Sequence, residues 1–216
     1  WVKALDERTI TFDAVSAGES YIRPVGNDVA QGEIIAVAGT RLGPITIGSL
    51  AASGIAQVTV RQRPVIGVFS SGDELIDISV PPSALQPGQI YDSNRRTVME
   101  LLRNLPLEIL DLGCLNDDPE TIRTALQQAA SRCDLLITSG GVSVGEADFI
   151  TQTISDLGEL VFWKLNIKPG KPLALGRIED CWILGLPGNP VSTIVTALLV
   201  GIPLAAHLAG FSPEPP

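Results

Sequence analysis

The 216-residue chain has little of what most catalytic and metal sites are built from, because it contains one histidine and three cysteines. The histidine, His207, lies in an apolar stretch far from any exposed nucleophile, which excludes Ser-His-Asp and Cys-His catalytic sets. The sequence also lacks the spacing of a zinc site. Cys114, Cys133 and Cys181 are widely spaced among apolar residues, so we expect buried thiols and a cytoplasmic protein.

Positive charge is scarce as well. The chain has 15 Lys and Arg residues against 24 Asp and Glu residues, which gives a net charge of −9 and a pI of about 4.6. Nonspecific binding of nucleic acid needs a dense field of Lys and Arg, so we expect no nucleic-acid partner. Any anionic ligand must therefore meet a local cluster of positive side chains.

The chain has no long uninterrupted hydrophobic run. Its most apolar stretch, Ile194 to Leu208, is broken by Thr196, Gly201 and Pro203 and is shorter than a bilayer span requires. We therefore expect a core helix there and no membrane partner. No charged start followed by an apolar run marks the N-terminus, so no secretory signal is expected.

With 45% hydrophobic and 18% charged residues, the chain has enough apolar material for a folded core. Residues 1–63 are predicted to form a small β-rich region, with a short helix that Thr46 caps and Gly54 ends. The extended segments of this region are predicted at 9–14, 33–38 and 57–60. Residues 64–210 are predicted to form a second domain, and 211–216 a tail.

Strand and helix patterns alternate in the second domain. Apolar runs typical of buried strands occur at 65–69, 108–112 and 135–138. Segments with helical apolar spacing follow them at 92–105, 119–129 and 150–157. Shorter strands are predicted at 160–163, 173–175 and 182–186, before a final helix near Asn189. This order predicts a three-layer α/β domain, in which a mostly parallel sheet carries helices on both faces.

Polar loops follow four of these strands, at the sheet edge where open parallel sheets bind ligands. They are Ser70 to Glu74, Asn116 to Asp118, Ser139 to Asp148, and Pro187 to Pro190. Gly140, Gly141 and Gly145 allow successive N–H groups to turn toward an anion, although a tight turn without a ligand needs the same glycines. Asp118 and Asp148 lie at helix starts, where plain N-capping is the alternative.

Charged side chains on this edge favour an anion site with a divalent cation. Acidic residues beside an anion-binding loop suit Mg²⁺, although Asp73 and Glu74 also fit a solvated turn. Three lysines lie within eight positions, at Lys164, Lys168 and Lys171, and neighbouring prolines stiffen their segment. A solvated basic loop is the alternative there. The Arg95-Arg96 pair is predicted to be a solvated helix start.

Five motifs occur in an order that resembles the molybdopterin molybdenumtransferase (MoeA) family, which includes the gephyrin E domain. They are Ser71 to Leu75, Ile90 to Asn94, Ser139 to Asp148, Lys168 to Pro172, and Gly185 to Pro190. The turn from Arg23 to Asp28 also looks like a turn of that family. The resemblance implies molybdenum cofactor biosynthesis: molybdate is inserted into adenylylated molybdopterin with a divalent cation, here Mg²⁺, and AMP is released.

The resemblance also implies site residues. The residues that match catalytic positions are Glu74, Asp118, Asp148, Lys164 and Lys168. The implied binding set is Asp28, Ser139, Gly140, Gly141, Ser143, Gly145, Lys171, Pro187, Asn189 and Pro190. Our hypothesis gives Mg²⁺ or its waters to Glu74 and Asp118, orientation of the pterin to Asp148, and molybdate to the lysines.

Family members carry a further N-terminal portion and a small C-terminal β-domain, so the chain is expected to be a central fragment. The resemblance also implies a homodimer in the full-length form. The molybdopterin adenylyltransferase is a candidate partner. Two alternatives stay open: an adenylyltransferase of the MogA type, whose α/β domain resembles residues 64–210, and a noncatalytic molybdopterin-binding scaffold. The run Val142 to Asp148 and the β-rich region favour the molybdenumtransferase.

Overall fold

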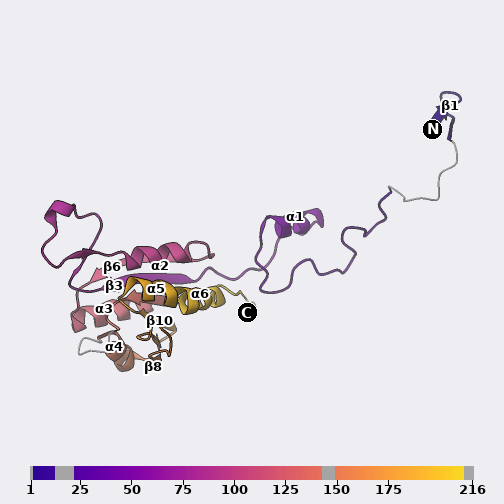
Figure 1. The fold of residues 1–216 in the computed structure, drawn as a ribbon. Helices are drawn as coiled ribbons and strands as arrows, with labels where there is room; N and C mark the ends of the chain where they lie inside the picture. The colour runs from indigo at the N-terminus through magenta and orange to yellow at the C-terminus, as the bar shows by residue number, and fades with distance from the viewer. Residues whose placement is uncertain (1, 13–21, 143–148, 212–216) are drawn as a thin grey trace. The chain divides into compact units, whose positions relative to one another are not determined.

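The computed structural model describes residues 2–12, 22–142 and 149–211 (Figure 1). The chain divides into two compact units, Trp1–Val58 and Thr59–Pro216. The domain boundary after residue 63 stays a prediction.

The first unit has less β-structure than its sequence suggests. Strands β1 (Val2–Ala4) and β2 (Ile10–Phe12) form an antiparallel pair, which confirms a strand in the 9–14 segment. The predicted strands at 33–38 and 57–60 are wrong, because neither segment has strand structure. Strand propensity needs a partner ladder, and without one the apolar side chains stay in solvent, as at Ile34, which is 74% exposed.

The predicted short helix is present as α1 (Pro44–Ala52). It begins three residues earlier than expected, because Pro44 occupies the first turn and Gly43, rather than Thr46, is the N-cap. Its end is as predicted: Gly54 has a φ of +74°, and the amide of Ile55 donates to the carbonyl of Leu50 at 2.9 Å. These features form a Schellman motif, which satisfies the last helix carbonyls.

The second unit is built on a six-stranded sheet in the order β6-β3-β7-β10-β9-β8. The strands are β3 (Val65–Ser71), β6 (Glu108–Leu115), β7 (Leu135–Ser139), β8 (Glu159–Trp163), β9 (Ala174–Ile178) and β10 (Cys181–Leu186). Strands β6, β3, β7 and β10 are mutually parallel, and β9 runs antiparallel between β10 and β8. A small parallel pair, β4 (Leu75–Ile76) and β5 (Ile90–Tyr91), and a 3-10 turn, η1 (Pro82–Ala84), precede the first helix of the unit.

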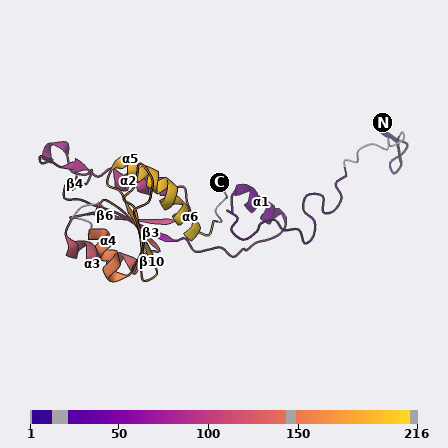
Figure 2. The same cartoon turned by 60° about the horizontal axis from the view of Figure 1, so that its bottom comes forward.

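Helices cover both faces of the sheet. Figure 2 shows α3 (Pro119–Ala130) and α4 (Phe149–Leu157) on one side, with α2 (Asn94–Leu102), α5 (Pro190–Thr196) and α6 (Ile202–Leu208) on the other. Two hydrophobic cores correspond to these sides, one containing Leu126 and Ile154, the other Val98 and Ala205. The predicted three-layer, mostly parallel α/β architecture is confirmed.

The C-terminal helix runs from Pro190 to Leu208, with π-helical hydrogen bonding at η2 (Ala197–Gly201) between α5 and α6. Its 19 residues have a mean hydropathy of 1.9, so length and composition alone would suit a membrane span. In this fold the helix packs on α2, and Thr193, Ala197 and Ala205 are buried. One face of the helix thus belongs to the core, whereas Val191, Leu198 and Leu199 are exposed, and 33% of the apolar span is buried.

The three cysteines differ in how deeply they are buried. Cys133 and Cys181 are buried as predicted, whereas Cys114 is only partly covered, and none forms a disulfide. Burial raises the pKa of Cys181 to about 12 and that of Cys114 to about 11. All are therefore protonated near neutral pH and are poor nucleophiles.

Candidate functional site

The register of the sheet brings the predicted loops to one edge. Ser70 pairs with Ser139, Ser71 with Leu115, and Leu186 with Ser139, so the carboxyl ends of β3, β6, β7 and β10 lie in one row. The loops after these strands therefore start side by side. Because β8 runs parallel to β10, β8 ends at the same edge with Trp163, and Lys164 follows Trp163 in the chain.

Glycines after β7 allow very close packing on the end of β3. Gly140 and Gly141 have φ values of +95° and +65°, which L side chains rarely adopt. A Cβ on Gly140 would collide with the carbonyl of Ser71, and one on Gly141 would lie 2.7 Å from the Ser71 hydroxyl. The Ser71 hydroxyl is buried, and no described residue is its hydrogen-bond partner. The sequence did not single out Ser71.

Three carboxylates gather over β3 and β6. The carboxylate of Glu74 folds back over Gly72, and Asp73 accepts a hydrogen bond from the amide of Asp117 at 3.0 Å. Burial raises the pKa of Asp117, and the charges of Asp73 and Glu74 raise it further. Oxygen Oδ1 of Asp117 is buried without a partner among the described residues. A cation or a proton there would relieve this charge.

Asp118 has a different environment. It is the N-cap of α3: its Oδ2 accepts from the amide of Thr121 at 2.8 Å and from the Thr121 hydroxyl at 2.7 Å. These bonds lower the pKa of Asp118. N-capping, the alternative considered above, therefore describes its side chain, and the catalytic and metal roles assigned to Asp118 stay predictions.

We expect Asp118→Ala to lower the free energy of unfolding measurably, because α3 loses its cap. The free energy of unfolding should fall much less in Asp118→Asn, because the asparagine side-chain oxygen still accepts a hydrogen bond from Thr121. Urea unfolding followed by circular dichroism measures both changes. Equal losses in the two variants would show that the carboxylate charge, and not the cap, stabilises α3.

The basic segment lies at the opposite end of the same edge. From β3 to β8 there are four strand spacings, about 19 Å, which separates Lys164 from the carboxylates. Lys164 has a φ of +70° and places its ammonium 3.7 Å from the centre of the Trp163 ring. Lys168 and Lys171 are exposed on either side of Gly170, which packs against Thr196 of α5.

The loop after β10 is held by internal hydrogen bonds. Asn189 caps α5, since its side-chain oxygen accepts from the amides of Val191 at 3.1 Å and Ser192 at 3.2 Å. The hydroxyl of Thr193 donates to the carbonyl of Pro187 at 2.6 Å. Pro187 is buried and Pro190 is exposed. These contacts fix the loop at the edge, next to Gly140.

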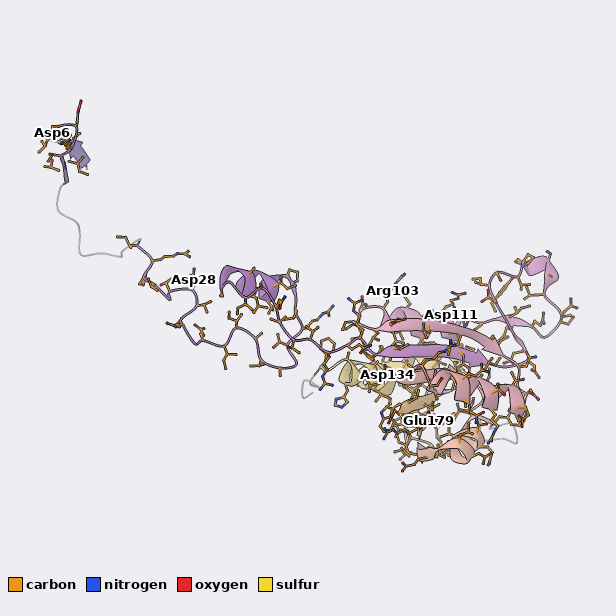
Figure 3. The ribbon with its side chains drawn as sticks, turned by 180° about the vertical axis from the view of Figure 1, so that it is seen from behind. Asp6, Asp28, Arg103, Asp111, Asp134 and Glu179 are labelled. Carbon is orange, nitrogen blue, oxygen red and sulfur yellow. The ribbon has the colours of Figure 1, made fainter. Side chains whose placement is uncertain are left out.

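Four predicted site residues are not part of this picture. Asp28 belongs to the first unit, where it is paired with Arg23 at 2.9 Å (Figure 3). Ser143, Gly145 and Asp148 lie outside the described residues.

The prediction that Arg95 is solvated at the start of a helix is wrong. Its side chain is 3% exposed rather than solvated and forms ion pairs with Asp92, Asp77 and Asp111, the last on β6 in Figure 3. Burial alone would lower the pKa of Arg95, but these hydrogen bonds raise it above its ordinary value. The neighbouring Arg96 is half exposed, as predicted.

Comparison with known proteins identifies the family. Residues 67–207 match the family described as "Probable molybdopterin binding domain". The chain belongs to this family. It is 46% identical to molybdopterin molybdenumtransferase of Haemophilus influenzae over 95% of this chain and 50% of that protein. It is 31% identical to gephyrin of Dictyostelium discoideum over 96% of this chain and 32% of that protein.

Solved structures agree with this membership. The molybdopterin biosynthesis MoeA protein of Pyrococcus horikoshii superposes with a TM-score of 0.73 at 34% identity, over 86% of this chain and 45% of that chain. The chain thus spans about half the length of the curated molybdenumtransferase that it matches over nearly all of its own length. The resemblance to the MoeA family and the predicted fold class are confirmed.

Proposed function

We propose that this chain is the molybdopterin-binding part of a molybdenumtransferase, which inserts molybdate into adenylylated molybdopterin and releases AMP. The observation that carries the proposal is the edge of the sheet, where the loop after β7 that contains Gly140 and Gly141, here called the glycine loop, lies between carboxylates and lysines. The relative named molybdopterin molybdenumtransferase matches 95% of the chain, including the first unit, which favours this activity over that of an adenylyltransferase.

The glycine loop supplies the site for the substrate phosphates. Backbone at positive φ at Gly140 and Gly141 permits N–H groups of the loop, other than that of Gly140, which donates to the Leu186 carbonyl, to converge on an anion. The loop leads to the start of α4. The Ser71 hydroxyl below the loop has a hydrogen to donate. These groups would bind and orient the substrate.

Mg²⁺ fits the carboxylates if the substrate supplies further ligands. Among the described residues no group of three His, Cys, Asp or Glu side chains could hold a metal ion alone. Mg²⁺ commonly uses one or two protein carboxylates together with substrate phosphates and water. We therefore assign the ion to Glu74 and Asp117, whose buried Oδ1 has no partner in the described part of the chain. When bound, Mg²⁺ supplies positive charge to the adenylate phosphate.

The lysines would bind molybdate at the other end of the edge. Molybdate is a small dianion, and Lys168 and Lys171 are exposed cations on a segment that Gly170 anchors to α5. Asp148, which lies outside the described residues, keeps the hypothetical role of orienting the pterin. This division places molybdate and phosphate chemistry at separate points of one elongated substrate.

We expect Lys168→Ala to raise the KM for molybdate about tenfold, which is the loss of one charge-assisted contact. The affinity for molybdopterin should change little, because the pterin is held elsewhere. Steady-state AMP release at varied molybdate measures the effect, and Arg177→Ala, at an exposed residue of β9 paired with Asp180, is the matched control. An unchanged KM would remove Lys168 from the molybdate site.

The proposal is tested with purified chain, adenylylated molybdopterin and Mg²⁺, with and without molybdate. AMP release that requires molybdate would establish the activity. Molybdopterin binding without AMP release would restrict this chain to substrate binding. Absence of molybdopterin binding would contradict the proposal.

We further infer that the complete protein is a cytoplasmic homodimer and interacts with the molybdopterin adenylyltransferase. The first unit leaves several apolar side chains in solvent, among them Val25, Val37 and Ile45. Such exposure favours burial against another protein surface. The mass of the full-length protein in solution distinguishes a dimer from a monomer.

A further inference from the structure

Asn94 connects two loops of the candidate site that are distant in sequence. It is the first residue of α2, and its side-chain amide donates to the Ser139 hydroxyl and to the Gly188 carbonyl, both at 2.8 Å. Ser139 ends β7 directly before the glycine loop, and Gly188 lies in the loop after β10. Both amide hydrogens of Asn94 are therefore used, one on each loop.

The two loops are in contact where Asn94 joins them. A Cβ on Gly188 would lie 3.8 Å from Cα of Gly140, and the amide of Gly140 donates to the carbonyl of Leu186 at 3.3 Å. In the described part of the chain, the pairing of β7 with β10 and a few further hydrogen bonds set the spacing of the glycine loop from the Pro187 loop. Two of them come from one side chain.

The start of α2 is a firm support for that side chain. Asp92 is buried; its Oδ1 accepts from the Ser70 hydroxyl on β3 at 3.0 Å, and its Oδ2 accepts from Arg95 at 2.8 Å. Asn94 lies between these two anchors in the chain. The helix start is therefore bonded to β3, to the end of β7 and to the loop after β10.

From this geometry we propose that Asn94 is a positioning residue, which holds the glycine loop and the Pro187 loop at the separation that the substrate requires. The inference rests on the proposed function for its ligand, molybdopterin. Asn94 acts through Ser139 and Gly188, whose hydroxyl and carbonyl it orients, and not by contact with the reacting atoms. The roles assigned above to the carboxylates and lysines do not involve the side-chain amide of Asn94.

Asn94→Asp is the sharpest test, because the carboxylate has the same shape but cannot donate. It would face the Gly188 carbonyl with an acceptor and separate the two loops. We expect the amide hydrogen exchange of Gly140 to become at least about tenfold faster, with no change at Leu136 in the middle of β7. The dissociation constant for molybdopterin should rise about tenfold.

Ser93→Asp is the matched control. Ser93 is the exposed N-cap of α2 and its side chain makes no capping bond, so the change adds a carboxylate at the same helix end without touching either loop. Exchange at Gly140 and molybdopterin affinity should stay at wild-type values. Asn94→Ala, which removes the donors without adding charge, should give the same local exchange as Asn94→Asp.

Exchange at Gly140 distinguishes the possible failures, since it is measured without a ligand. Wild-type exchange in both Asn94 variants would overturn the positioning role. Faster exchange with unchanged molybdopterin affinity would also overturn it, because the loop spacing would then not matter to the substrate. If the wild-type chain does not bind molybdopterin, the proposed function fails, while local exchange still decides whether Asn94 sets the loops.

Discussion

Arg95→Met is expected to lower the free energy of unfolding by about 3–5 kcal/mol, the largest loss of stability that we predict. The arginine side chain is 3% exposed and that of its partner Asp92 is 1% exposed. Removing the guanidinium leaves the Asp92 carboxylate buried with no opposite charge, and methionine supplies volume but no donor. Asp77 and Asp111 are more exposed, so water compensates part of their loss. Urea unfolding followed by circular dichroism measures the change.

Arg96→Met provides the control for Arg95→Met. Arg96 contacts the same two carboxylates, Asp77 at 3.3 Å and Asp111 at 3.5 Å, but it is half exposed, so its loss should cost at most about 1 kcal/mol. Adding Asp92→Asn to Arg95→Met should recover part of the loss, because the buried charge is then gone. Equal costs for the two arginine variants would contradict a buried ion-pair network.

Much of the fold was predictable because apolar periodicity reports burial directly. The runs at Val65–Phe69 and Leu135–Thr138 fall inside β3 and β7, which are buried on both faces. The same signal failed in the first unit, where Val37 and its neighbours are apolar but have no strand to pair with. Pairing is a long-range property, and composition of a short segment does not contain it.

The sequence likewise predicted some features of the candidate site and missed others. Strand order brought the glycine loop and Glu74 to one edge, as expected from topology alone. Which of two adjacent aspartates faces that edge was not readable, because Asp117 and Asp118 differ only in their side-chain directions at the end of β6. Arg95 was misread for a related reason: its three carboxylate partners lie on separate segments, at Asp77, Asp92 and Asp111.

AMP release should therefore depend on Asp117 and not on Asp118 when each is replaced by asparagine. We expect Asp117→Asn to reduce molybdate-dependent AMP release by at least about 100-fold, because the site loses one of its two proposed Mg²⁺ carboxylates. Asp118→Asn should stay close to wild type, since asparagine still caps α3. Glu74→Ala should match Asp117→Asn, and the double variant should be little worse than either, as expected for two ligands of one ion.

The thermal stability of the Asp117 and Asp118 variants gives a second, independent measurement. The raised pKa of Asp117 means that its ionised form is disfavoured in the folded chain. Above the ordinary carboxyl pKa, therefore, this group lowers stability as the pH rises through its folded pKa. Asp117→Asn removes that charge beside Asp73 and Glu74, so the melting temperature at pH 7 should rise while AMP release falls. A fall in both would indicate a structural role for Asp117, and loss of release in Asp118→Asn alone would assign the metal to Asp118 instead.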